Sequence, residues 1–422
     1  MGSYVPNTKE EQQAMLQEIG YPSMDDLFRD IPDKVKLDRE LDLPDGLSEM
    51  EVRKKMECIA AKNKIYPTIF RGAGAYRHYI PAIVDDVISK ENFQTAYTPY
   101  QAEISQGILQ SIFEYQTMIC DLTGMDVSNA SVYDGASAAA EGIAMCREKK
   151  RNKALISATV HPYVLKTVRT YCFGNGMDLE VIPEKDGVTD VEWLKGHLDR
   201  ETACVLIQHP NYYGTLEPAE ASVNPISLGI VKTPGEYGAD VAVGDGQPLG
   251  LPLAFGGPYV GFMACTKAMM RKLPGRIVGQ SKDHNGKIGY VLTLQAREQH
   301  IRREKASSNI CSNQALCALA VSVYLAAMGN KGLEQAASSS MSKAHYFAKL
   351  LAQIGFRTEN RGAFFHEFVT VSETPSEKAL QALEDHEILG GLPLDEHRIL
   401  WCCTEMNTKA EIDEAVRILK EV

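Results

Sequence analysis

Short apolar runs alternate with amphipathic stretches through the middle of the chain. An apolar run bounded by turn residues is typical of a strand buried in a sheet, whereas apolar residues at helical spacing are typical of a helix packed on that sheet. The alternation therefore predicts a mostly parallel sheet with helices on both faces. The predicted strands cover residues 153–158, 180–182, 203–211, 239–243 and 261–266.

A different pattern precedes this region. Thr8 to Glu11 form a capping box in front of apolar residues at helical spacing, and further helix starts follow at Ser23 and Ser48. The Pro- and Gly-containing stretch 42–46 interrupts the pattern. Residues 1–65 are therefore predicted to form a helical arm, which could wrap around a partner or pack on its own domain.

The pattern changes again towards the end of the chain. An apolar helix is predicted over residues 313–328, with its end at Gly329, and a second long helix follows over 332–354. We expect a large domain over 66–330 and a small α+β domain over 331–422. The strands and helices predicted in the last part cover residues 364–371, 376–386, 398–403 and 408–420.

Composition narrows the classes of function. The chain has 422 residues and a net charge of −11, and this acidic balance argues against nucleic-acid binding, which needs a basic face. No run approaches the ~20 apolar residues that span a bilayer. The ten cysteines include no Cys-x-x-Cys pair, so we expect reduced core residues in a cytoplasmic protein. The spacing of Cys and His predicts no metal site.

The stretch 237–261 holds seven glycines and three prolines around the predicted strand 239–243. Glycine permits positive φ and close approach of the backbone, so such a loop can close around a ligand or form a tight surface connection. Loops at the carboxyl ends of parallel strands are where α/β proteins place their sites. The loop after residue 243 is therefore the first candidate site.

This strand and loop, ending in Gly256-Gly257-Pro258, resemble the cofactor-lysine loop of glycine decarboxylase, the P-protein of the glycine cleavage system. In the active half of that family the loop begins with His-Lys-Thr, and the lysine forms a Schiff base with pyridoxal phosphate (PLP). Counting back from Gly-Gly-Pro, the lysine position falls on Gln247. An amide is not nucleophilic towards an aldehyde, whereas a desolvated lysine amine is. The resemblance therefore implies the half that binds no PLP covalently, with PLP in the partner subunit.

A second stretch, 93–105, contains the motif Tyr-Thr-Pro-Tyr-Gln-x-Glu-Ile-Ser. This motif closely resembles the sequence of the N-terminal half of the same family. From the residues alone, these polar side chains can be structural groups or parts of a site. By the resemblance, the loop forms one wall of an active site shared with the PLP-bearing half. The expected wall residues are Tyr97, Thr98, Tyr100, Gln101 and Glu103.

The segment 295–305 is rich in arginine and also carries glutamates. A solvated, ion-paired helix is one interpretation of this pattern. The resemblance implies instead that Arg297, His300 and Arg302 lie at the subunit contact or at the entrance of the active site.

Two further positions have counterparts that bind the cofactor in PLP relatives. The turn before Gly135 opens an Ala-rich helix, and helix N-termini bind anions, but Asp134 would repel a phosphate. We expect a vestigial site, or a helix cap by Asp134. His161 corresponds to a residue that stacks on the pyridine ring in PLP relatives, and without a cofactor a hydrogen-bonded histidine that caps a strand is expected. Lys232 and Lys267 are not expected to replace the missing lysine.

The segment 216–229 departs from the family. Relatives place a helix and a strand here, which together need roughly 16 residues. In this chain residues 216–224 connect the flanking motifs directly and are too few to form both elements. Losing a central strand would leave a hole in the sheet at a large cost in stability. We therefore expect residues left out of the sequence rather than a true deletion.

The resemblance covers nearly the whole chain and implies an α/β fold of the PLP-dependent transferase type (aspartate aminotransferase-like, fold type I). It implies a cofactor-free subunit that acts with a PLP-bearing subunit 2, as an α2β2 assembly in the cytoplasm, without nucleic acid or membrane as partner. The family reaction converts glycine and the lipoyl H-protein to CO2 and the aminomethyl-dihydrolipoyl H-protein. Two alternatives stay open, a stand-alone PLP-dependent aminotransferase or desulfurase, and a purely structural subunit.

Overall fold

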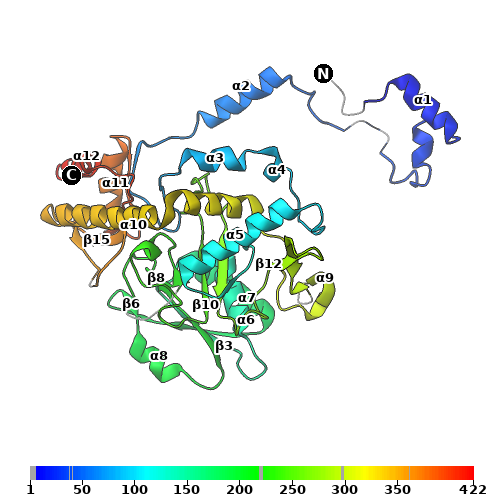
Figure 1. The fold of residues 1–422 in the computed structure, drawn as a ribbon. Helices are drawn as coiled ribbons and strands as arrows, with labels where there is room; N and C mark the ends of the chain where they lie inside the picture. Colours follow the sequence, from blue (N-terminus) through cyan, green and yellow to red (C-terminus); the bar gives the residue numbers. More distant parts are fainter. Residues whose placement is uncertain (1–5, 38, 40, 218–221, 296–298, 361) are drawn as a thin grey trace. The chain divides into compact units, whose positions relative to one another are not determined.

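The computed structural model describes residues 6–37, 39, 41–217, 222–295, 299–360 and 362–422. These residues fall into two compact units, Met1–Ile65 and Tyr66–Val422 (Figure 1). The boundary between the units lies where the sequence predicts the end of the helical arm.

The first unit contains two helices and a 3-10 turn, which are α1 Lys9–Glu18, η1 Asp25–Phe28 and α2 Glu49–Ala60. Both helices begin at predicted starts and with a capping box. The Thr8 N–H donates to Glu11 at 2.7 Å, and the Ser48 N–H donates to Glu51 at 2.8 Å. Among the described residues, α1 buries Leu16 alone and α2 buries none. The apolar side chains of this unit are therefore largely exposed.

The centre of the second unit is an interrupted sheet (Figure 1). Three parallel strands in the order β4-β3-β7 form one part, and three antiparallel strands in the order β10-β11-β2 form the other. The short β8 pairs in parallel with β9, which packs beside β10. Parallel pairing is thus confirmed for β4-β3-β7 and for β8-β9, whereas β11 pairs antiparallel with both of its neighbours. The strands are β2 Val127–Ser128, β3 Lys153–Ser157, β4 Asp178–Ile182, β7 Thr202–Leu206, β8 Gln208–His209, β9 Ser222–Val223, β10 Val241–Asp245 and β11 Gly261–Cys265.

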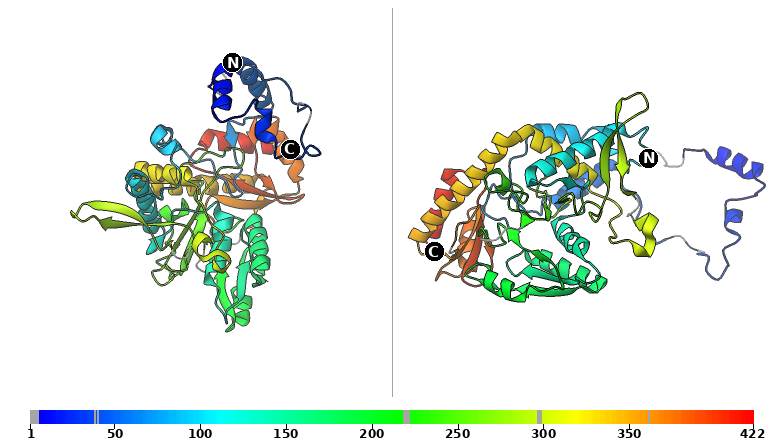
Figure 2. Two further views of the ribbon diagram at one scale, coloured as in Figure 1. Left: turned by 90° about the vertical axis from the view of Figure 1, so that its right-hand side faces the viewer. Right: turned by 60° about the horizontal axis from the view of Figure 1, so that its bottom comes forward.

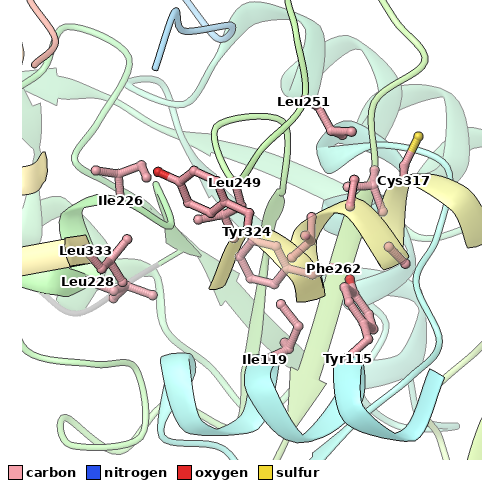
Figure 3. Close-up of a cluster of buried hydrophobic side chains, with 14 of the residues drawn as sticks. Tyr115, Ile119, Ile226, Leu228, Leu249, Leu251, Phe262, Cys317, Tyr324 and Leu333 are labelled. Carbon is pink, nitrogen blue, oxygen red and sulfur yellow. The ribbon is translucent and has the colours of Figure 1, made fainter. Parts of the chain in front are cut away.

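Helices cover both faces of β11, because its alternate residues belong to different apolar clusters. Phe262 packs in a cluster with α5 (Gln106–Thr123) and α10 (Ala315–Gln353), and Figure 3 shows it near Tyr115 and Tyr324 of these helices. Met263 packs in a second cluster with α6 (Gly135–Cys146) and α7 (Pro162–Asn175). The expected helix–sheet–helix layering is therefore confirmed.

Helix α10 is interrupted at Gly329, whose φ of 59° and ψ of −178° are not helical. The predicted end of the apolar helix at this residue is confirmed, as is the long helix after it. Among the described helices, α10 is long and apolar enough to cross a membrane, by length and composition only. Polar residues such as Asn330 and Lys331 interrupt its sequence, so it is not an unbroken run of ~20 apolar residues. Val321 and Tyr324 of α10 are fully buried inside the unit.

The last part of the second unit is an antiparallel sheet in the order β14-β15-β18-β17, which shares one apolar cluster with α10, α11 and α12. Its mixed content agrees with the predicted α+β pattern. The expected boundary after residue 330 lies inside α10, and a separate domain over 331–422 stays a prediction because 66–422 form one compact unit. The elements are β14 Arg357–Thr358, β15 Glu367–Val371, α11 Ser376–Glu384, β17 Leu392–Pro393, β18 Arg398–Cys402 and α12 Lys409–Leu419, with β1 Thr68–Ile69 paired to β16 Ile388–Leu389.

A long hairpin of β12 (Ile277–Lys282) and β13 (Ile288–Thr293) projects from the rest of its unit in both views of Figure 2, where it is yellow-green. The short α9 (Gln299–Arg302) and η4 (Arg303–Lys305) follow it. Further elements of the unit are α3 Ala82–Ile88, α4 Glu91–Gln94, β5 Glu184–Lys185, β6 Val188–Thr189, α8 Val191–His197 and η2 Ser227–Gly229.

Candidate functional site

A cavity of about 720 Å³ lies at the carboxyl end of β10, between the N-termini of α6 and α7. We call it the central cavity. Its position matches the first candidate site, since sites of α/β folds lie beyond the carboxyl ends of strands. Its lining includes Tyr76, Tyr133, Asp134, His161, Asp245 and Tyr259.

Gln247, the residue at the predicted lysine position, is fully buried and lies beside the cavity rather than in its lining. Its side-chain oxygen accepts from the Tyr76 N–H at 2.8 Å. Its side-chain nitrogen donates to the carbonyl oxygens of Tyr76 and Leu251, both at 2.9 Å. The amide is thus fully used in joining the 246–251 loop to the loop that contains Tyr76, which is a structural task.

Two carboxylates occupy the N-terminus of α6. Asp245 accepts from the Gly135 N–H at 2.9 Å and from the Gln247 N–H at 2.9 Å. Asp134 caps the helix by accepting from the Ser137 N–H at 2.7 Å, which confirms the predicted cap. Burial raises the pKa of Asp245 to about 6, and the nearby Asp134 charge acts in the same direction.

These residues do not fit PLP. The turn that holds the cofactor phosphate in PLP enzymes of this fold has its first amides bound to carboxylates, which would repel a phosphate. Among the described residues no lysine lines the central cavity, so no amine is in place to form an imine with the aldehyde. Lys232 and Lys267 are exposed and lie outside that lining.

His161 lies in the lining and is held by two hydrogen bonds. Its Nε2 lies 3.0 Å from the Ala73 carbonyl oxygen, and its Nδ1 accepts from the Tyr163 N–H at 3.1 Å. The ring is therefore neutral, with the proton on Nε2, and burial lowers its pKa. The predicted hydrogen-bonded histidine is confirmed, but the prediction that it caps a strand is wrong, because it caps the N-terminus of helix α7.

The five expected wall residues lie together on a loop outside the central cavity. The side chain of Tyr97 is 85% exposed and that of Tyr100 is 56% exposed. The Tyr100 hydroxyl accepts from Arg276 at 2.9 Å, and the guanidinium lies 5.3 Å from the ring centre. Gln101 and Glu103 are exposed, and Thr98 is half-buried. In this chain they therefore face outwards, and their role as a wall of a shared site stays a prediction.

The arginine-rich segment is only partly described. Arg297 lies outside the described residues, and His300 is placed only by its backbone in α9. Arg302 ends α9 and is exposed. Their predicted place at a subunit contact or active-site entrance stays a prediction.

The buried hydrogen bond between Tyr76 and Glu367 was not predicted. Glu367 of β15 is fully buried and accepts from the Tyr76 hydroxyl at 2.8 Å and from the Ala73 N–H at 2.6 Å. Burial raises the pKa of Glu367 to about 7. Because Ala73 and Tyr76 both line the central cavity, this carboxyl ties that wall to the C-terminal sheet. The one signal in the sequence is a polar His-Glu pair, 366–367, inside an apolar strand.

Metal binding has no support in the described part of the chain. No group of three or more His, Cys, Asp or Glu side chains there is arranged to hold a metal ion. The side chains that line the central cavity offer amide, phenol and imidazole groups beside two carboxylates.

Three comparisons with known proteins agree. A family model described as "Glycine cleavage system P-protein" matches residues 2–419. A "Probable glycine dehydrogenase (decarboxylating) subunit 1" of Desulfitobacterium hafniense is 49% identical over 445 residues, covering 100% of both chains. A protein of the same description from Carboxydothermus hydrogenoformans is 50% identical over 439 residues, covering 99% of both.

Solved structures give the same result. The crystal structure of an inhibitor-bound glycine decarboxylase (P-protein) of the glycine cleavage system matches with a TM-score of 0.93 and 41% identity, covering 100% of both chains. A sphingosine-1-phosphate lyase of Burkholderia pseudomallei matches at 14% identity with a TM-score of 0.63, over 92% of this chain and 94% of that one, which shows the shared fold alone. The expected fold type I architecture is confirmed, and the chain belongs to the glycine cleavage system P-protein family.

Proposed function

We propose that this chain is the half of a split glycine decarboxylase that carries no PLP, and that it works with a PLP-bearing partner subunit. The observation that carries the proposal is the buried amide of Gln247 at the lysine position, together with the carboxylates at the start of α6. The description "subunit 1" of its relatives supports a divided enzyme.

The proposed reaction is that of the family, in which glycine and the lipoyl H-protein give CO2 and the aminomethyl-dihydrolipoyl H-protein. Stabilisation of the carbanion is the task of PLP in the partner subunit. No step is assigned to a cofactor on this chain. We further propose an α2β2 assembly in the cytoplasm.

The contribution of this chain is proposed to be one wall of the partner's active site. Tyr97 and Tyr100 present large, exposed aromatic surfaces, which are common anchors in protein interfaces. Arg276, itself 5% exposed, fixes the hydroxyl of Tyr100 and so orients the loop before any partner binds. Arg297, His300 and Arg302 are proposed to lie at the contact or entrance of the same site.

The purified chain distinguishes this proposal from a stand-alone PLP enzyme. Alone, after incubation with PLP and removal of the unbound cofactor, it should show no imine absorption band, and it should release no CO2 from carboxyl-labelled glycine. Together with the PLP-bearing subunit and lipoyl H-protein, it should be required for that release. An imine absorption band in the isolated chain that borohydride fixes would establish the stand-alone enzyme instead.

Paired variants distinguish an active-site wall from a purely structural subunit. Tyr100→Phe combined with Gln101→Ala should lower kcat/KM for glycine at least tenfold while the assembled complex stays intact by sedimentation. Tyr79→Phe is the matched control, because Tyr79 is also 56% exposed and lies outside the 97–103 loop. Unchanged decarboxylation by the double variant would show that the 97–103 loop is not part of the active site.

A further inference from the structure

The central cavity has the size and the lining of a ligand site. Its volume of about 720 Å³ lies within the range of ~300–1,000 Å³ that is usual for small-molecule sites. Aromatic and aliphatic side chains make up much of its wall, with a small number of polar groups between them. The proposed function assigns no ligand to this cavity, because PLP does not fit it.

The charge of the lining is negative. Asp134 and Asp245 both belong to it, and among the described residues no lysine or arginine does. Burial raises the pKa of Asp245 to about 6, and repulsion from the Asp134 charge adds to this effect. Asp245 is therefore mainly ionised at neutral pH beside a second negative charge, and a cation in the cavity would be attracted by both.

The start of α6 offsets only part of this charge. A helix N-terminus carries about half a positive charge, whereas two carboxylates lie against it. Asp134 caps the helix with one oxygen, Oδ1, which accepts from the Ser137 N–H at 2.7 Å. No hydrogen bond between described residues uses its other oxygen, Oδ2. That oxygen is available to accept from a ligand.

Aromatic rings of the lining can hold the apolar part of such a ligand. Tyr133, Tyr163 and Tyr259 all contribute to the wall. The hydroxyl of Tyr259 donates to the Leu253 carbonyl oxygen at 2.8 Å, which fixes the orientation of that ring. Lys166 lies 5.4 Å from the centre of the Tyr163 ring and outside the lining. Tyrosine faces pack against apolar groups and also attract cations.

We propose that the central cavity binds a small organic cation with an apolar body, whose charged group lies at Asp134 and Asp245 and whose body packs against the tyrosines of the wall. A metal ion is the poorer occupant, because no group of three or more His, Cys, Asp or Glu side chains among the described residues is arranged to hold one. The site takes the position of the cofactor cavity of PLP relatives with the opposite preference for charge. It goes beyond the proposed function, since it belongs to this chain alone and needs no partner subunit.

Three probes with one indole body and different charges test the proposal. At neutral pH tryptamine is a cation, tryptophol is neutral and indole-3-propionate is an anion. Calorimetric titration of the full chain should show that tryptamine binds at least tenfold more tightly than tryptophol, and that indole-3-propionate binds most weakly. Equal affinities, a preference for the anion, or no binding of tryptamine at millimolar concentration would overturn the proposal.

A charge variant checks where the cation binds. Asp134→Asn removes the charge and keeps the helix cap, because Asn and Asp cap helices about equally well. It should weaken tryptamine binding at least tenfold and leave tryptophol binding unchanged. Asp190→Asn is the matched control, because Asp190 caps α8 by accepting from the Glu192 N–H at 3.0 Å and lies outside the lining. Equal losses of tryptamine binding in the two variants would reject the charge assignment.

A second variant keeps the proposal testable if Asp134→Asn does not fold. Tyr163 is 66% exposed, and its backbone N–H rather than its side chain bonds His161, so Tyr163→Ala should leave the fold intact. It should weaken tryptamine and tryptophol by the same factor, at least threefold, because the ring contacts the indole that both probes share. Tyr79→Ala is the control, since Tyr79 is 56% exposed and lies outside the lining. Unchanged binding of both probes by Tyr163→Ala would place them outside the central cavity and reject the site.

Discussion

At the residue scale, Gln247 places a structural amide at the proposed position of the cofactor lysine. A lysine there would bring a buried ammonium against the Tyr76 N–H, which is itself a donor. We expect Gln247→Lys to lower the free energy of unfolding by ~2–4 kcal/mol. We also expect no imine band with added PLP, because Asp134 and Asp245 still occupy the start of α6.

Urea unfolding and absorbance titration with PLP measure these two effects. Gln280→Lys is the control, since Gln280 is exposed on β12 and should change stability by less than about 0.5 kcal/mol. A stable Gln247→Lys variant with a borohydride-fixed PLP adduct would contradict the structural role of the amide.

Glu367 should make stability depend on pH. Burial raises its pKa from 4.5 to about 7 in the folded chain, so the unfolded chain loses the proton first as the pH rises. The stabilisation from the protonated carboxyl is complete below pH 4.5 and is lost as the pH rises to about 7. The loss is about 3 kcal/mol over that interval.

Replacing the carboxyl by an amide should remove this dependence. The free energy of unfolding of the unmodified chain should fall by about 3 kcal/mol more than that of Glu367→Gln between pH 4.5 and 7. Urea unfolding at several pH values gives both curves. Glu334→Gln, at an exposed helical position, should follow the unmodified chain. Parallel curves for Glu367→Gln and the unmodified chain would show that folding leaves the pKa of Glu367 unchanged.

The sequence predicts which residues matter here but not what they contact. Gln247 could be located because a short motif lies a fixed distance after it. Its partner Tyr76 lies 171 positions away, and Asp245 and Gly135 lie 110 positions apart. Pairings of this range depend on how the loops pack in three dimensions, and no local pattern encodes them. Glu367 was missed for the same reason, since its partners come from the other end of the unit.

At the scale of elements, Gly329 decides where α10 breaks. Its φ of 59° lies in the left-handed region, which a side chain disfavours by ~1–2 kcal/mol. We expect Gly329→Ala to lower the free energy of unfolding by about that amount. Gly174→Ala in α7 should instead raise it by ~0.5–1 kcal/mol, because a Cβ there meets open space and helix propensity improves. Thermal unfolding compares the two, and equal effects would argue against a break enforced by Gly329.

Helix ends were predictable because their signals are local, such as Thr8 with Glu11 before α1 and Gly329 inside α10. The antiparallel pairing of β11 was not predictable, because an apolar run has no direction until its neighbours are known. The interruption beside β10 could be anticipated only from the missing length between residues 216 and 224. Its shape, with β9 closing one end, required the structure.

At the scale of the whole molecule, the proposed role in a divided enzyme requires a surface that binds the partner subunit. The N-terminal unit presents apolar side chains that it does not bury itself. Met56 is 57% exposed and Ile59 is 49% exposed, and three-residue spacing places them on one face of α2. An exposed apolar face of this kind is typical of a surface that a partner covers.

The last prediction follows from that face. Met56→Glu combined with Ile59→Glu should weaken binding of the PLP-bearing subunit at least tenfold, equivalent to about 1.4 kcal/mol, because two charges would be desolvated at the contact. The melting temperature of the isolated chain should not change, since neither side chain is buried. Glu57→Lys, on the same helix and exposed, is the control for a charge effect alone. Sedimentation of mixed subunits measures the affinities. Unaltered binding by the double variant would show that α2 is not part of the assembly contact. It would favour the alternative that the helical arm packs on its own domain.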